Sequence, residues 1–325
     1  MKTLQTVQIA FALAAALCCT SGAAAQSYPS KSIRLIVPYP PGGANDNIAR
    51  PLVHYLSENM GTQVILENRG GGGALIGADI VAKSTPDGYT LLFCSTATQA
   101  TSPQLFKNVP YDPIKDFDTV TLAVDSAVVL TVHPSVPAQS VKELVALIRA
   151  NSGKYSYASP GTGTPPQLVG ALFRLSLDLD LVHVPFSGGG PAIGSTVAGH
   201  TPVSFGAMAP AVPLVKDGKL RALAVTSKAR TAVLPEVPTM AEAGYPDVEG
   251  SSWTAVVVPA GTPKEIIASL HRMIAAIVAL PDIKERLGAL GYEPIGSTPD
   301  QCLEFFKTEM AKWSKVIRAS GIKAE

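Results

Sequence analysis

Cysteine and histidine are scarce in this sequence, and the few that occur are spread along it. The 325 residues include 4 cysteines and 5 histidines, and Cys18 and Cys19 both precede residue 26. A structural metal site needs several such ligands close together. One pair as widely separated as Cys94 and Cys302 is no disulfide framework, so we expect both to be free, buried thiols. The sequence thus predicts no metal site and no cofactor.

The chain also lacks an excess of charge of either sign. It contains 26 basic and 25 acidic side chains, and Lys2 is the only charged residue among the first 25. Such a balance provides no basic surface for nucleic acid or for an anionic membrane. We therefore expect an anion, if one binds, to be held by hydrogen bonds and local dipoles.

Catalytic and nucleotide-binding signatures are missing as well. The glycine run Gly70–Gly73 does not complete the dinucleotide-binding pattern, and no glycine loop is followed by the lysine and hydroxyl of a P-loop. There is no nucleophile-elbow serine, zinc-protease motif or Cys-x-x-Cys motif. We assign no catalytic residue and expect the protein not to be an enzyme.

After residue 25, no part of the chain has the run of about 18 apolar residues that a membrane-spanning helix needs. Residues 1–25 have the composition of a secretory signal peptide: Lys2 precedes the apolar stretch Ile9–Leu17, and the small residues Ser21–Ala25 follow. We expect cleavage before Gln26, export to the periplasm and no insertion of the mature chain in the membrane.

Short β-rich runs and apolar-periodic stretches alternate along the rest of the chain. Expected strands are residues 32–37, 63–67, 90–94, 117–123, 127–132, 155–158, 181–184, 203–205, 220–226 and 253–258. Expected helices are residues 48–59, 74–82, 141–150, 166–175, 190–198, 211–216, 264–280 and 299–320, the first capped by Asn45 or Asp46. Strands that alternate with helices are typical of parallel sheets covered by helices.

The order of these elements predicts two lobes. The β-rich runs at 117–123 and 127–132 have no helix between them, so the chain leaves the first unit near Val124 and returns near Gly250. We expect residues 26–125 and 250–325 to form lobe 1, and residues 126–249 to form lobe 2. Two connections make a hinge, and ligand clefts usually lie at such an interface.

Three loops rich in glycine and proline connect an expected strand to an expected helix. They are Val37–Asp46, Ala158–Gln167 and Val184–Ala192. Each ends at a helix N-terminus, where unpaired N–H groups and the helix dipole favour an anion. The carboxyl ends of parallel strands meet at one edge, so the loops would gather there, with hydroxyls from Ser95–Thr98 nearby. The residues alone leave open that the first loop is only a stiff connecting turn.

Several short motifs follow one another in a fixed order along the chain. They are Pro38–Gly43 followed by Asn45-Asp46, then Val64–Gly73, Ala82–Leu92, Tyr111–Pro113 with Asp116-Phe117, Val132–Ser135, Gly218–Ala224, Leu234–Gly244 and Pro259–Pro263. Together they resemble the motifs of the tripartite tricarboxylate transporter receptors, also called Bug-type solute-binding proteins. The resemblance implies a monomeric periplasmic receptor with the type II clamshell fold, each lobe a mostly parallel sheet flanked by helices. Such a receptor hands a small aliphatic or aromatic mono- or dicarboxylate to membrane permease subunits.

The resemblance also implies which residues line the ligand cleft. They are Tyr39, Gly43, Ala44, Asn45, Asp46, Ser95 and Thr96 from lobe 1, and Gly163, Thr164, Pro185, Phe186 and Ala207 from lobe 2. Ala207 replaces an aspartate of many relatives, and Gln167 replaces a histidine. A missing acid argues against ligands with an amine, and Phe186, often tyrosine in relatives, favours an aromatic acid. The sequence does not separate uptake from delivery of the ligand to a sensor, because both use the same clamshell.

Overall fold

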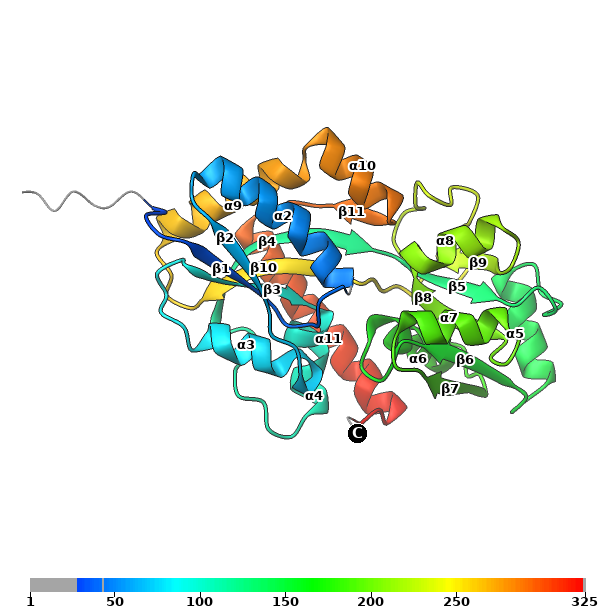
Figure 1. Cartoon of the computed structure of the whole chain (residues 1–325). Coiled ribbons are helices and arrows are strands. Elements are labelled where there is room, and N and C mark those ends of the chain that lie inside the picture. Colours follow the sequence, from blue (N-terminus) through cyan, green and yellow to red (C-terminus); the bar gives the residue numbers. More distant parts are fainter. Residues whose placement is uncertain (1–27, 43, 324–325) are drawn as a thin grey trace, which may run out of the picture.

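The computed structural model describes residues 28–42 and 44–323, so the expected signal peptide and Gly43 lie outside the described residues. The chain forms two lobes side by side, each built on one sheet with helices packed against it (Figure 1). The predicted α/β fold, a two-lobed clamshell, is confirmed.

The sheet of lobe 1 has the strand order β11-β4-β10-β3-β1-β2. Its strands are β1 (Ile33–Val37), β2 (Val64–Asn68), β3 (Thr90–Ser95), β4 (Phe117–Ser126), β10 (Thr254–Pro259) and β11 (Tyr292–Pro294). The helical elements of this lobe are α2 (Ala44–Met60), η1 (Gly72–Ala74), α3 (Leu75–Ala82), η2 (Ala97–Thr101), α4 (Ser102–Leu105), α9 (Lys264–Val278), α10 (Pro281–Ala289) and α11 (Pro299–Ser320). Helix α2 begins before Asn45 and Asp46, so these residues lie in its first turn and do not cap it from outside.

The sheet of lobe 2 has the order β7-β6-β8-β5-β9. Its strands are β5 (Val128–Val132), β6 (Tyr155–Ser159), β7 (Leu181–Pro185), β8 (Val203–Ala207) and β9 (Arg221–Val225). Its helices are α5 (Val141–Ala150), α6 (Pro165–Ser176), α7 (Gly189–Val197) and α8 (Met208–Lys216).

Both sheets are mixed, so the expectation of mostly parallel sheets was wrong. In lobe 1, β1 runs parallel to β2 and β3, but β10 is antiparallel to β3 and β4, and β11 is antiparallel to β4. In lobe 2, β6 is parallel to β7 and β8, whereas β5 is antiparallel to β8 and β9. A helical crossover returns the chain in the same direction. Strands β5 and β10 enter directly from the other lobe, and so they run against their neighbours.

The two connections between the lobes lie side by side. Ala127 and Ser251 form an isolated antiparallel bridge, and Ser252 N donates to Ser126 O at 2.8 Å. Gly250 N donates to Thr226 O at 3.1 Å. The hinge is therefore a short two-stranded ribbon and not two independent linkers.

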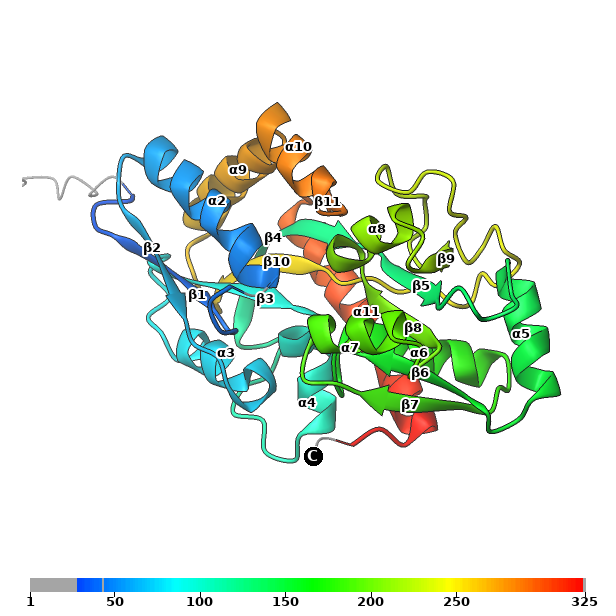
Figure 2. The ribbon, with the colours of Figure 1, turned by 45° about the vertical axis from the view of Figure 1, so that its right-hand side comes forward.

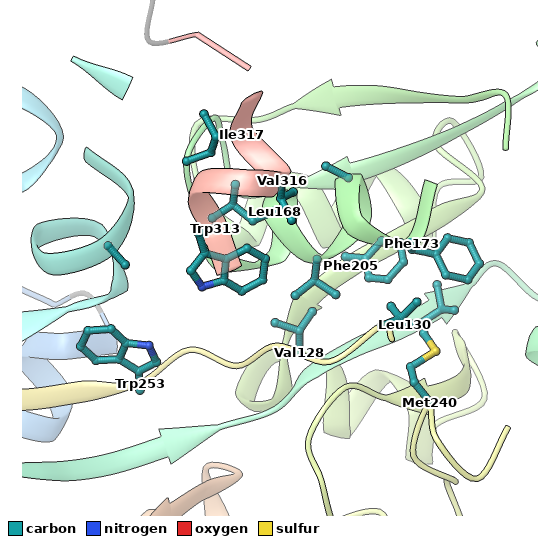
Figure 3. Close-up of a cluster of buried hydrophobic side chains, with 14 of the residues drawn as sticks. Val128, Leu130, Leu168, Phe173, Phe205, Met240, Trp253, Trp313, Val316 and Ile317 are labelled. Atoms are coloured by element: carbon teal, nitrogen blue, oxygen red, sulfur yellow. The ribbon is translucent and has the colours of Figure 1, made fainter. Parts of the chain in front are cut away.

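Helix α11 bridges the lobes from below the ribbon (Figures 1 and 2). It packs against β4 of lobe 1 and against α6 of lobe 2. The largest buried apolar cluster accordingly runs through both lobes, and Figure 3 shows Trp313 beside Leu168 in it, with Trp253 set apart on the connection. Cys94 and Cys302 lie in the same cluster as free, buried thiols, as expected. One continuous core thus links the two walls of the cleft.

Within the described ranges, no single helix is long and apolar enough to cross a membrane. The pair α9 and α10 passes the length and composition criteria together, with a bend of 68° between the two helices.

Candidate functional site

A cavity of about 500 Å³ lies between the lobes and is lined by residues of both. Among the residues that the structure describes, none with a charged side chain lines it. The lining residues are Pro38, Tyr39, Pro40, Ala44, Asn45, Gly71, Gly73, Ala74, Ser95, Thr96, Ala97, Ser102, Leu105, Phe106, Ser126, Thr162, Gly163, Thr164, Pro165, Ala207, Ser252, Trp253, Thr254 and Tyr292. This volume is in the range of pockets that enclose small organic ligands.

Most of the residues that the sequence singled out lie in this wall. Those that line the cavity are Tyr39, Ala44, Asn45, Ser95, Thr96, Gly163, Thr164 and Ala207. Asp46, Pro185 and Phe186 do not line it, and Gly43 lies outside the described residues. Their contact with a ligand stays a prediction, and for Asp46 the surroundings indicate a different role.

Asp46 holds the first loop against helix α2. Its side chain is 1% exposed and accepts hydrogen bonds from Gly42 N at 2.8 Å, Arg50 Nε at 2.8 Å and Asn68 Nδ2 at 3.0 Å. Burial alone would raise the pKa of Asp46, but these hydrogen bonds outweigh it and hold the pKa below its usual value. Asp46 therefore shapes the loop that carries Tyr39 and does not present its carboxylate to the cavity.

Pro185 and Phe186 lie just outside the cavity, at the end of β7. Phe186 N donates to Ser159 O at 3.0 Å, and a Cβ placed on Gly161 would lie 3.2 Å from the carbonyl oxygen of Phe186. Phe186 therefore contacts the second loop through its backbone.

The lobe 1 wall presents a group of polar side chains. Tyr39 Oη and Ser95 Oγ share a hydrogen bond of 2.6 Å, and Thr254 Oγ1 donates to Asn45 Oδ1 at 3.0 Å. Burial raises the pKa of Tyr39 to about 12, despite the opposing bond to Ser95, so the phenol stays neutral. Thr96 is 1% exposed, and its Oγ1 has no hydrogen-bond partner among the described residues. A buried hydroxyl without a partner is costly, so a ligand atom that bonded to it would be favoured.

Three helices begin at the cavity. Ala44 and Asn45 open α2, Thr164 precedes α6 at its N-cap, and Ala207 precedes α8. The first N–H groups of a helix lack partners within it, and the dipole places partial positive charge there. An anion in the cavity would meet N–H groups of α2 from lobe 1 and of α8 from lobe 2. Helix α6 begins with Pro165 and Pro166, which have no N–H, so its first two positions contribute only the dipole.

A hydrogen-bonded pair of side chains, Ser159 and the half-buried His183, holds the second loop. Ser159 Oγ lies 2.7 Å from His183 Nε2, and Gly161 N donates to Ser159 Oγ at 3.3 Å. Burial lowers the pKa of His183 to about 4, so the ring is neutral at neutral pH. Ser159 is fully buried and does not line the cavity, so this serine–histidine pair orients the loop and reaches no ligand.

The lobes touch directly at one edge of the cleft. Thr101 Oγ1 of η2 donates to Gly163 O at 3.1 Å across the gap. Gly163 has a φ of +78°, and a Cβ on it would lie 2.7 Å from Leu105 Cδ1. Glycine is required here both for the backbone conformation and for the close approach of the lobes.

Several lining residues were not predicted from the sequence. Trp253 lies on the returning connection, Thr254 begins β10, and Tyr292 comes from the three-residue strand β11. The expected crossing near Gly250 was a signal for Trp253, since residues of a hinge border the cleft. Gly71 and Gly73 line the cavity although their run matches no phosphate-loop pattern. No group of three or more His, Cys, Asp or Glu side chains placed to hold a metal occurs within residues 28–42 and 44–323.

Comparisons with known proteins agree with this architecture. Residues 48–322 match the model of the tripartite tricarboxylate transporter family receptor. The chain is 36% identical to protein BugT of Bordetella pertussis over 300 residues, which cover 92% of this chain and 92% of BugT.

Two similar solved structures contain a carboxylate. The Rhodopseudomonas palustris protein MatC, with bound malate, is 29% identical with a TM-score of 0.75, over 89% of this chain and 100% of that one. The protein Rpa4515 of R. palustris, with adipate, is 32% identical with a TM-score of 0.80, over 91% of this chain and 99% of that one.

Proposed function

This chain belongs to the tripartite tricarboxylate transporter receptor family, and from that premise we propose that its cleft captures a small organic carboxylate for delivery to membrane permease subunits. As a member of this family it is a periplasmic solute-binding protein. The observation that supports the proposal best is the cavity between the lobes, with its uncharged wall, three helix N-termini and the unpartnered hydroxyl of Thr96.

These features fit an organic anion such as a carboxylate better than a cation. N–H groups and hydroxyls can donate to carboxylate oxygens without any cationic side chain. Ala207 leaves the wall without an acid, so a ligand ammonium would have no counter-charge. Leu105, Phe106 and Trp253 add apolar surface, which suits the body of an aliphatic or aromatic acid.

We also propose how the protein reaches the periplasm and how it acts there. The chain is exported by a cleavable signal peptide over residues 1–25 and acts as a monomer without catalysing a reaction. The lobes, residues 26–125 with 250–325 and residues 126–249, close on the ligand about the ribbon. Loss of ligand uptake in cells lacking the permease would support transport, and retained uptake would favour a sensory role.

The experiment is a thermal-shift screen of residues 26–325 against citrate, C4 to C6 dicarboxylates, benzoate, nicotinate, terephthalate and common amino acids. A ligand that binds only the folded state raises the melting temperature by mass action. We expect one class of acid to give a large shift and the amino acids to give none. A folded protein, free of co-purified ligand, that responds to none of these acids would contradict the proposal.

Replacement of Thr96 provides a matched test of the site. Thr96→Val removes the buried hydroxyl at nearly constant volume, so we expect about tenfold weaker binding of the best acid by calorimetry. Thr96→Ser keeps the hydroxyl and should bind within about threefold of wild type. Equal affinity of the valine and serine variants would place the ligand away from Thr96.

A further inference from the structure

Glu309 is a buried carboxylate in the middle of α11, and its neighbours are hydrogen-bond donors. Its side chain is 3% exposed. Oε2 accepts from Trp253 Nε1 at 3.0 Å and from Trp313 Nε1 at 2.7 Å, and Oε1 pairs with Lys312 Nζ. Trp253 and Trp313 are the 2 tryptophans of the sequence. A buried carboxylate persists only where donors surround it, so three donors on one side chain mark a specific arrangement.

Trp253 connects this carboxylate to the ligand cleft. It lies on the returning connection, lines the cavity and is 1% exposed. Its ring stacks on Phe306 of α11, with 5.0 Å between ring centroids, and meets Phe305 edge-on at 5.4 Å. The stacking and the bond to Glu309 both come from α11, so this helix fixes the ring in the cleft wall.

Trp313 connects the same carboxylate to lobe 2. A Cβ on Gly250 would lie 2.8 Å from the Trp313 ring and 2.7 Å from Val169 Cγ2 of α6, so the three groups are packed together. Figure 3 shows Trp313 on α11 beside Leu168, and Trp253 separated from it on the connection, with the indole nitrogens on the facing sides of the two rings. Trp313 does not line the cavity.

Helix α6 connects Trp313 to the cleft, because Thr164 and Pro165 at the start of this helix line the opposite wall of the cavity. Each wall of the cleft therefore contacts α11. Trp253 reaches it through Glu309, and α6 reaches it through Trp313.

We propose that Glu309 is a positioning residue for ligand binding, which couples Trp253 in the cleft wall to Trp313 at the contact between α11 and lobe 2. The inference rests on the proposed function of the cleft. Glu309 itself does not line the cavity, so its effect on affinity is exerted through the two indoles. Without this acceptor, both buried N–H groups lose their partner and the Trp253 ring loses its fixed orientation.

The test uses the two indole N–H signals in the NMR spectrum of residues 26–325, assigned with Trp313→Phe. In wild type, the best acid from the thermal screen should shift both signals. In Glu309→Met, which cannot accept from the indoles, the acid should shift only the Trp253 signal and bind about tenfold more weakly. Glu309→Gln keeps one oxygen acceptor, so it should restore affinity to within about twofold and shift both signals.

Two further variants separate coupling from general destabilisation. Trp313→Phe should weaken binding about as much as Glu309→Met, and the double variant should be no weaker than either single variant, because both remove one pathway. Ile148→Val, in the lobe 2 core on α5 and outside the path through α6 and α11, should lower the melting temperature without changing affinity. Wild-type affinity in folded Glu309→Met, with ligand shifts still present at Trp313, overturns the proposal.

The outcomes also separate this proposal from that for the cleft. If Glu309→Met does not fold, the affinity of Trp313→Phe for the acid is the test. Wild-type affinity in Trp313→Phe overturns the coupling. If wild type binds no acid, the proposed function fails. The spectra without ligand then test the role of Glu309. A Trp253 signal that is displaced in Glu309→Met supports the proposal that Glu309 positions this ring, and an unchanged signal overturns it.

Discussion

Tyr39 and His183 stand on opposite lobes, and burial keeps both of them neutral. It raises the pKa of Tyr39 to about 12 and lowers the pKa of His183 to about 4. Neither group changes its charge between these values. The polar groups that shape both walls therefore keep the same hydrogen-bonding state across the neutral range, and an anionic ligand meets an unchanged site.

His183 should make stability depend on pH. Its pKa of about 4 in the folded protein lies below the ordinary value of about 6.5 for an unfolded chain, so the unfolded state binds more protons as the pH falls. Its contribution is fully present above about pH 6.5 and is lost progressively toward pH 4. We expect the melting temperature of wild type to fall more steeply over this window than that of His183→Gln. Parallel curves for the two proteins would assign the acid sensitivity to other groups.

At the scale of elements, the loop before α6 decides how closely the lobes approach. Gly163→Ala would place a Cβ 2.7 Å from Leu105 Cδ1 and force a left-handed backbone on alanine. We expect about tenfold weaker ligand binding by calorimetry, because the closed contact through Thr101 is disturbed. The double variant Gly163→Ala with Leu105→Ala should recover part of the loss. No change in affinity on either substitution would show that closure does not use this contact.

Two glycines in helices of lobe 2 should respond in opposite directions when each is replaced by alanine. A Cβ on Gly170 of α6 would lie 2.3 Å from Tyr157 Cε2, so Gly170→Ala should destabilise the fold by about 1–3 kcal/mol through overpacking. Gly194 of α7 has no neighbour within 4 Å, so Gly194→Ala should stabilise it by about 0.5–1 kcal/mol. Urea unfolding measures both, and effects of the same sign would contradict the packing described for α6.

Periodicity and turn residues allowed most elements to be predicted, but not their direction. Strand β10 is an apolar run whether it runs parallel or antiparallel, and only its entry from the other lobe decides between the two. Strand β11 is too short for any pattern to indicate, so Tyr292 was missed. Asp46 was assigned to the cleft from its place in a motif, whereas its bonds to Gly42 and Arg50 turn it toward the loop.

At the scale of the whole molecule, the uncharged cleft predicts how binding responds to salt. Helix dipoles and hydroxyls inside a cavity between two lobes are screened much less than exposed ion pairs. We expect the dissociation constant of the best acid to change less than about threefold between about 20 and 500 mM sodium chloride, by titration calorimetry. A steep loss of affinity with salt would require a cationic side chain at the ligand, which the cavity wall does not contain.

The meeting of the first and second loops at one cleft could be predicted from the sequence, since each joins a strand to a helix. The third loop, residues 184–192, was expected there too, but none of its residues lines the cavity. Residues such as Trp253 and Ser126 could not be placed in this way, because they line the cavity only after the ribbon brings distant segments together. The unpartnered hydroxyl of Thr96 is likewise a property of the packed molecule.

The position of both tryptophans at one carboxylate has an optical consequence. Both tryptophans of the sequence lie at Glu309, so light that excites tryptophan alone would give emission only from the junction between the lobes. A change of tryptophan emission on ligand binding would therefore report on this junction alone, without an added label.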